Sequence, residues 1–147
     1  MRIERLNPGY VPAGSALTLS KAIHDGKLIK LDTLTGSTVI LPPALGTGGM
    51  FWFIETVAPT SNNHIVKVAN SVDVMMGLLI GIGGAASDLV GYAAAAADDT
   101  ITLNRTTTGG TIRGEWFELI DMAPGLWFVR GAFKSSGVQA TPFSSTV

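Results

Sequence analysis

The stretch WFELIDMAPGLWFVRGAF, residues 116–133, decides the fold class of this 147-residue chain. It contains two runs rich in aromatic and branched residues, 116–122 and 126–133, on either side of Pro124-Gly125. Such runs favour β-strands, and a Pro-Gly pair between them favours a tight reversal, so we predict a hairpin. Both runs are apolar on both faces for part of their length. We therefore expect them inside a sandwich or at a subunit contact.

Short strands separated by turns extend this pattern along the chain. Apolar residues alternate with other residues at Leu17 and Leu19, Ile29 and Leu31, Val39 and Leu41, and Ile101 and Leu103. Turn-forming residues recur between them at spacings of roughly 8 to 14 residues, as in antiparallel all-β domains. We predict an all-β domain over residues 17–133, built as an antiparallel β-sandwich or a jelly-roll-like barrel.

The two ends of the chain differ in composition from this domain. Residues 1–16 hold two prolines and two glycines, which prevent a helix, so we predict an extended N-terminal arm that lies along a neighbouring subunit or the surface of another protein. A disordered terminus is the alternative. Residues 134–147 form a small, polar C-terminal tail that either frays or crosses a neighbouring subunit. The residues that we expect to contact another subunit are Arg2, Ile3, Leu6, Tyr10, Val11 and Phe143.

Charge and cysteine content exclude several classes of function. Only 14% of residues are charged, and ten basic residues nearly balance eleven acidic ones. No basic cluster would attract nucleic acid, and so little charge covers a monomer poorly, so we expect a homo-oligomer, with a trimer favoured. The absence of cysteine excludes disulfides, thiolate metal sites and a cysteine nucleophile. The apolar run 74–87 is shorter than the ~20 residues of a spanning helix, so we expect no membrane segment.

Residues of chemical interest do not form a catalytic pattern. Residues 81–86 match a variant of the dinucleotide fingerprint, but no helical pattern follows, so we interpret them as a glycine loop. His24 and His64 lack metal-ligand spacing, and we expect turn or solvated histidines. Glu115 and Glu118 have odd spacing, which favours one exposed charge and one cross-strand partner over a catalytic pair. We predict no enzymatic activity, cofactor or metal.

Four stretches carry a resemblance to a known family. They are LIKLDTLTGSTVILPPALGTGGMFWFI (28–54), IVKVANSVDVMMG (65–77), DDTITLNRTTTGGTIRGEWFELIDMAPGLWFV (98–129) and ATPF (140–143). The chain resembles the head decoration, or capsid cement, proteins of bacteriophages. The resemblance implies a β-sandwich or jelly-roll-like subunit that is made in the host cytoplasm, trimerises on the capsid exterior and clamps major capsid proteins.

The tryptophans leave a second function open. Trp52, Trp116 and Trp127 are each flanked by phenylalanine in a predicted strand, which favours core or interface packing. They also suit a sugar-stacking platform. The alternative function is therefore a receptor-binding or carbohydrate-binding β-module of a phage tail.

Overall fold

The computed structural model describes residues 9–84 and 88–147, and these residues form mostly β-strands. The strands are β1 (Tyr10–Pro12), β2 (Ala16–Thr18), β3 (Leu28–Leu31), β4 (Thr38–Ile40), β5 (Met50–Glu55), β6 (His64–Lys67), β7 (Val74–Ile82), β8 (Leu89–Ala93), β9 (Thr100–Leu103), β10 (Trp116–Ala123), β11 (Leu126–Lys134) and β12 (Phe143–Ser144). A single-turn helix, α1 (Lys21–His24), lies between β2 and β3. The predicted all-β class is confirmed.

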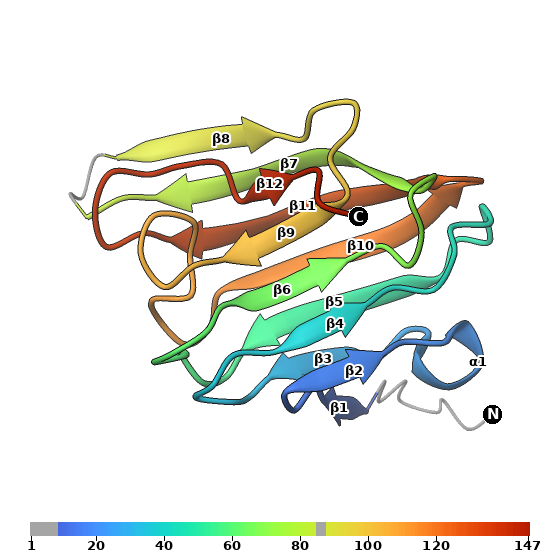
Figure 1. Ribbon diagram of the computed structural model, residues 1–147, viewed down its shortest axis with the longest axis horizontal. Coiled ribbons are helices and arrows are strands. Elements are labelled where there is room, and N and C mark those ends of the chain that lie inside the picture. Colours follow the sequence, from blue (N-terminus) through green and yellow to red (C-terminus); the bar gives the residue numbers. More distant parts are fainter. Residues whose placement is uncertain (1–8, 85–87) are drawn as a thin grey trace, which may run out of the picture.

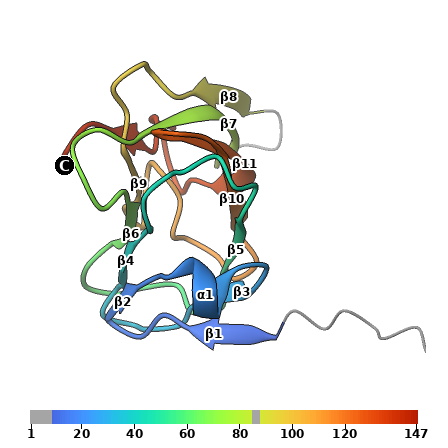
Figure 2. The same ribbon diagram turned by 90° about the vertical axis from the view of Figure 1, so that its right-hand side faces the viewer.

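The strands form two sheets that pack against each other. The seven-stranded sheet has the order β1-β3-β5-β10-β11-β7-β8, and the five-stranded sheet has the order β12-β9-β6-β4-β2 (Figure 1). Seen after a quarter turn, the two sheets form two layers, with β4, β6 and β9 in one and β5, β10 and β11 in the other (Figure 2). The predicted β-sandwich is therefore confirmed.

The pairing within the sheets differs from the antiparallel arrangement expected from the sequence. Among the described residues, five of the ten strand pairings are parallel. Four of these five follow from the path of β1 to β6, in which each connection carries the chain from one sheet to the other, and the fifth pairs β7 with β11. Strands two apart in sequence, such as β3 and β5, therefore run in the same direction. The turns do reverse the chain, but across the sandwich instead of within one sheet.

The predicted hairpin lies in the middle of the seven-stranded sheet. β10 and β11 pair antiparallel from Trp116↔Ala132 to Ala123↔Leu126, and Gly125 takes a positive φ of 77° at the reversal. The hairpin inserts between β5 and β7. A bulge between Asp121 and Ala123 precedes the turn. The hairpin predicted from residues 116–133 is confirmed, and one face of it lies in the core of the sandwich.

The core between the sheets is aromatic in the middle. Trp127 and Phe51 are fully buried, with ring centroids 5.8 Å apart. Phe53 and Phe117 stack at 4.9 Å. Burial of each such side chain contributes roughly 1.5–3 kcal/mol to folding, so these residues hold the two sheets together.

The C-terminal residues return to their own domain. Phe143 is 5% exposed and β12 pairs with β9, where Phe143 lies opposite Ile101. The Thr146 and Val147 amides donate to the Asp99 carboxylate at 2.9 and 3.2 Å. The expectation that residues 134–147 fray or cross a neighbour is wrong, because these bonds and the buried ring anchor them to the five-stranded sheet.

Part of the predicted arm is also a strand of its own domain. β1 is extended and pairs in parallel with β3, so the chain from Tyr10 to Pro12 forms an edge of the seven-stranded sheet. The Ala13 amide continues this ladder by donating to the Lys30 carbonyl at 2.9 Å. The expectation that the arm leaves the domain therefore does not hold for residues 10–16. Arg2, Ile3 and Leu6 lie outside the described residues.

Candidate functional site

The outer face of the seven-stranded sheet is apolar, although it does not face the core. In β7, alternate residues point into the sandwich, and the residues between them, Met76, Leu78, Ile80 and Ile82, are 39–53% exposed. A strand with one wetted face normally shows polar residues on that face. β7 instead carries large apolar side chains on both faces.

The strand registers align the outward residues in rows across the whole sheet. One row runs from β1 to β8 through Tyr10, Leu28, Trp52, Glu118, Arg130, Leu78 and Ala93, and the next through Pro12, Lys30, Ile54, Trp116, Ala132, Ile80 and Gly91. We call these two rows, together with Met50, Met76, Ile82, Leu89, Ile120, Met122 and Phe128, the apolar face. Its charged residues are Lys30, Glu118 and Arg130, with Lys134 at the margin beside Ile82.

An ion pair lies near the centre of the apolar face. Glu118 and Arg130 stand opposite each other on β10 and β11, and the Arg130 Nε donates to the Glu118 Oε1. The Glu118 side chain is 8% exposed and that of Arg130 is 61% exposed. A carboxylate covered to this degree by apolar neighbours requires a paired charge. The pair therefore neutralises the centre of the face within one chain.

A shallow groove of about 360 Å³ opens beside this ion pair. Trp52 and Trp116, which are 44% and 47% exposed, are part of its lining. The groove is lined by Leu28, Trp52, Phe53, Ile54, Trp116, Phe117, Glu118 and Arg130. Mostly apolar walls with a few polar groups are typical of a binding site.

The outer face of the five-stranded sheet has a different composition. Its outward rows are Ala16, Thr38, Ile65 and Thr102, then Thr18, Ile40, Lys67, Thr100 and Ser144. We call these nine residues the threonine face. Threonine combines a high preference for strands with a hydroxyl group that water can solvate. Thr100 differs from the others, since it is 2% exposed and its hydroxyl donates to the Asp99 carboxylate. This face therefore needs no protein cover.

The predicted contact residues fall in different places. Tyr10 is 62% exposed at the edge of the apolar face, with the Lys30 Nζ 3.4 Å from its ring centroid. Val11 packs against the core cluster, and Phe143 belongs to that cluster. Of the residues that the structure describes, Tyr10 alone among the predicted contacts offers most of its side chain to a partner. Trp127 is buried, so a platform of three tryptophans reduces to Trp52 and Trp116.

Sequence reasoning missed a buried polar cluster where one end of β5 meets the five-stranded sheet. Glu55 and His64 are each 1% exposed, and both Glu55 carboxyl oxygens lack a hydrogen-bond partner among the described residues. The His64 Nε2 donates to the Val57 carbonyl at 3.1 Å. The Glu115 carboxylate accepts hydrogen bonds from the Gly110, Thr111 and Ile112 amides at 2.7–3.1 Å.

Burial shifts the acid–base behaviour of this cluster. Burial, and secondarily the Glu115 carboxylate, raises the pKa of Glu55 to about 8. Burial lowers the pKa of His64, against the opposing effects of the Val57 carbonyl and the Asp32 and Glu115 carboxylates. The expectation of a turn or solvated histidine is wrong for His64, which is 1% exposed in β6. The expectation that one of Glu115 and Glu118 is an exposed charge is also wrong, because both are buried and Glu115 binds the 110–112 loop from inside. The expected cross-strand partner is Glu118.

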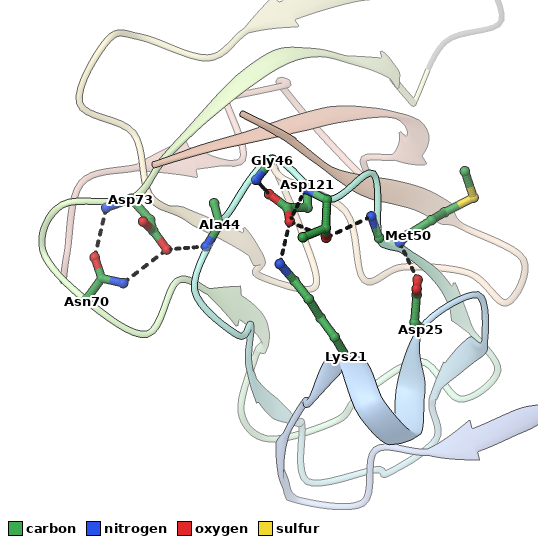
Figure 3. Close-up of polar contacts among 10 residues, drawn as sticks. Lys21, Asp25, Ala44, Gly46, Met50, Asn70, Asp73 and Asp121 are labelled. Carbon is green, nitrogen blue, oxygen red and sulfur yellow. Dashed lines mark hydrogen bonds and ion pairs between the residues drawn. The ribbon is translucent and has the colours of Figure 1, made fainter. Parts of the chain in front are cut away.

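Three aspartates fix the loop of residues 41–49, between β4 and β5 (Figure 3). Asp121 accepts from the Gly46 and Thr47 amides at 2.7 and 2.9 Å and pairs with Lys21. Burial would raise the pKa of Asp121, but the hydrogen bonds from Lys21, Thr47 and Gly46 outweigh it and hold that pKa far below its usual range. These groups bind each other, so their role is structural.

The contacts of the other two aspartates hold the ends of the same loop. Asp73 accepts from the Ala44 amide at 2.9 Å and from the Asn70 side chain at 3.0 Å. Asp25 accepts from the Met50 amide at 2.7 Å. Backbone amides in a loop need acceptors, and these carboxylates provide them. The loop thereby presents Leu45, which is 63% exposed, in a fixed position.

Metal sites, membrane spans and the glycine-rich segment 81–86 were the other features to consider. Within residues 9–84 and 88–147, no group of three or more histidines or acids is placed to hold a metal ion. No helix in the same part of the chain has the length and apolar character needed to cross a membrane. Of the glycine-rich fingerprint, Gly81 lies in β7 and Gly83 follows that strand, whereas Ala85 and Ala86 lie outside the described residues.

The comparisons with known proteins give no family assignment. No family model matches the chain, and it matches neither a curated protein nor a solved structure.

Proposed function

We propose that the chain is a structural subunit of a bacteriophage virion, a decoration or cement protein. It is made in the host cytoplasm, assembles as a homotrimer and binds the major capsid protein on the capsid exterior. The observation that carries this proposal is the apolar face, because a sheet surface with large exposed apolar side chains on β1, β5, β7, β8 and β10 calls for a protein partner. The resemblance of residues 28–143 to decoration proteins supplies two kinds of partner, other copies of this chain and the major capsid protein.

The mechanism follows from repetition of modest contacts. An interface of about 800 Å² per partner gives specific binding, and repetition over a lattice multiplies its effect because many contacts must break together. No reaction is involved. Aspartates hold the loop of residues 41–49 in a single conformation, which limits the entropy lost when a surface of this kind docks.

Binding to shells tests the proposal. Purified chain is mixed with shells assembled from the major capsid protein of the phage that encodes it, and bound copies are counted after sedimentation. We expect on the order of hundreds of copies per shell and a higher temperature of shell rupture, because the contacts add over the lattice. Failure to cosediment, or a few copies at one vertex, would contradict a cement role.

A second candidate function is glycan binding by a phage tail module. The specific observation is the groove between Trp52 and Trp116, where two half-exposed indoles lie beside the Glu118–Arg130 pair. Such rings can stack on a sugar while the charged groups bind its hydroxyls. Tryptophan fluorescence during titration with host-surface polysaccharide tests it, with Trp52→Ala and Trp116→Ala expected to weaken binding at least tenfold if the groove is the site.

A further inference from the structure

We infer that the apolar face is the surface through which copies of this chain bind each other, with β7 of one copy seated in the Trp52–Trp116 groove of the next. The inference rests on the proposed assembly role and specifies which surface serves self-association. It leaves other surfaces to contact the shell. The fixed loop that exposes Leu45 is one of them.

The first reason is the area of apolar surface. Nine large residues of the face are each 39–67% exposed: Tyr10, Trp52, Met76, Leu78, Ile80, Ile82, Leu89, Trp116 and Met122. Aromatic side chains have roughly 150–250 Å² of surface when free, and leucine, isoleucine and methionine lie near the lower end of this range, so these nine offer on the order of 800 Å². The largest apolar patch of a typical monomer is about 300–600 Å², whereas a standard interface takes about 800 Å² from each partner. The face is large enough for a stable contact between two chains.

The second reason is the balance of charge. Glu118 is already paired with Arg130 in its own chain, and the Lys30 ammonium lies over the Tyr10 ring. A partner therefore needs no opposite charge at the centre, and a partner with strong charge would have it buried without a counter-ion. A second copy satisfies this condition because its own face is neutral at the centre. The threonine face does not need to be covered.

The third reason is shape. Ile80 of β7 lies between Ala132 and Gly91, and Leu78 has Ala93 on one side, so the β7 side chains are larger than most of their neighbours and form an apolar ridge. The groove lies over β5 and β10, beyond β11. Ridge and groove are separated by β11. A ridge in the groove of the next copy is a head-to-tail contact, and such a contact repeated about a threefold axis closes a trimer. Each chain then contributes one ridge and one groove.

Cysteine cross-linking tests this contact, because the chain has no cysteine of its own. Leu78→Cys, on the ridge, is mixed with Ile54→Cys, in the groove, and the mixture is oxidised with copper phenanthroline. The matched control mixes Thr38→Cys with Thr102→Cys on the threonine face. We expect a disulfide-linked dimer containing both variants in the first mixture and none in the control. In unoxidised oligomers, we expect maleimide to label Leu78→Cys at least tenfold more slowly than Thr38→Cys.

Three results would overturn the inference. Equal labelling of Leu78→Cys and Thr38→Cys, with no cross-link, means that the apolar face is free. Protection of Leu78→Cys only after shells are added means that the face binds the capsid, and protection only by host polysaccharide means that it binds glycan. Cosedimentation of the unsubstituted chain with shells is measured separately, so failure of the self-contact is distinguishable from failure of the proposed function.

Discussion

The outer faces of the two sheets differ in residue composition. Both sheets pair strands in regular registers, and both present apolar residues to the shared core. On the outside, the five-stranded sheet carries threonines, with Lys67 and two isoleucines, whereas the seven-stranded sheet carries tryptophan, methionine, leucine and isoleucine. Strand formation needs only the first composition, because threonine fits a strand as well as isoleucine does. The second composition is not required by the fold, and it is the composition that the proposed self-contact would need.

The largest effect is expected when a charge is placed on each face in turn. Ile80 in β7 and Ile65 in β6 are outward isoleucines within their sheets. We expect Ile80→Lys to weaken self-association roughly thousandfold, about 4 kcal/mol, because an unpaired ammonium is then buried at the contact. Ile65→Lys leaves association within twofold. Sedimentation velocity at several concentrations measures both. Equal effects would show that the two faces do not differ in function.

The pH dependence of the free energy of unfolding tests a residue in the interior of the sandwich instead of one on its outer faces. Because the pKa of Glu55 is raised to about 8, the folded chain keeps a proton that the unfolded chain has already lost at pH 6.5. The free energy of unfolding therefore falls as pH rises, by about 2 kcal/mol between pH 6.5 and 8.5, and then levels off. Glu55→Gln removes this fall. Chemical denaturation at each pH measures it, and a flat profile in the unsubstituted chain contradicts the assignment.

His64 also makes the free energy of unfolding depend on pH, on the acid side of pH 6.5. Its pKa is lowered in the fold, so the unfolded chain takes up a proton near pH 6.5 that the folded chain resists. The His64 contribution to stability therefore decreases as pH falls below 6.5, while the Glu55 contribution still increases down to pH 4.5 and offsets it. Glu55→Gln removes this offset, so we expect a fall in stability below pH 6.5 in that variant and a nearly flat profile there in the unsubstituted chain. The self-association constant measured over pH 6.5–8.5 should stay within a few-fold, since no proton is exchanged in an apolar contact.

The smallest expected effect concerns the single charge pair at the centre of the apolar face. Arg130→Met leaves the Glu118 carboxylate without its partner and should lower the free energy of unfolding by about 1 kcal/mol, a modest value because Arg130 is 61% exposed. Lys67→Met on the threonine face should change it by less than about 0.5 kcal/mol. Urea midpoints compare the two. A neutral Arg130→Met would mean that water, not Arg130, satisfies Glu118.

The positions of the strands could be predicted from the sequence better than the order in which the strands pair. Residues 116–133 show the hairpin locally, because the Pro-Gly reversal and both strands are contiguous. Turns such as Thr35-Gly36-Ser37 signal a reversal but carry no information about which sheet receives the next strand, so the parallel pairing of β3 and β5 could not be predicted. Chain-end composition also misled, since Phe143 is a lone apolar residue in a polar stretch, and only the three-dimensional core shows where its ring packs.

Part of the candidate site could also be predicted from local sequence. Apolar residues at consecutive positions of 116–122 and 126–133 indicated that neither face of the hairpin is wetted, and the outward positions of these strands lie on the apolar face. The contribution of β7 to the apolar face was harder to predict, because Val74 to Ile82 is a single apolar run without alternation. The buried Glu55 and Glu115 gave no signal, since neither the spacing nor the neighbours of an acidic residue show that it faces inward.

The place of the β10–β11 hairpin has a consequence for synthesis. Strands β5 and β7 are made long before residue 116, yet in the finished sheet they are separated by β10 and β11. A nascent chain therefore exposes the unpaired edges of both strands until residue 134 has left the ribosome. Such edges recruit other strands, and closure between distant segments is slow. We expect ribosome-bound chains that end before the hairpin to depend on chaperones, and complete chains to fold only after β10 and β11 have been released.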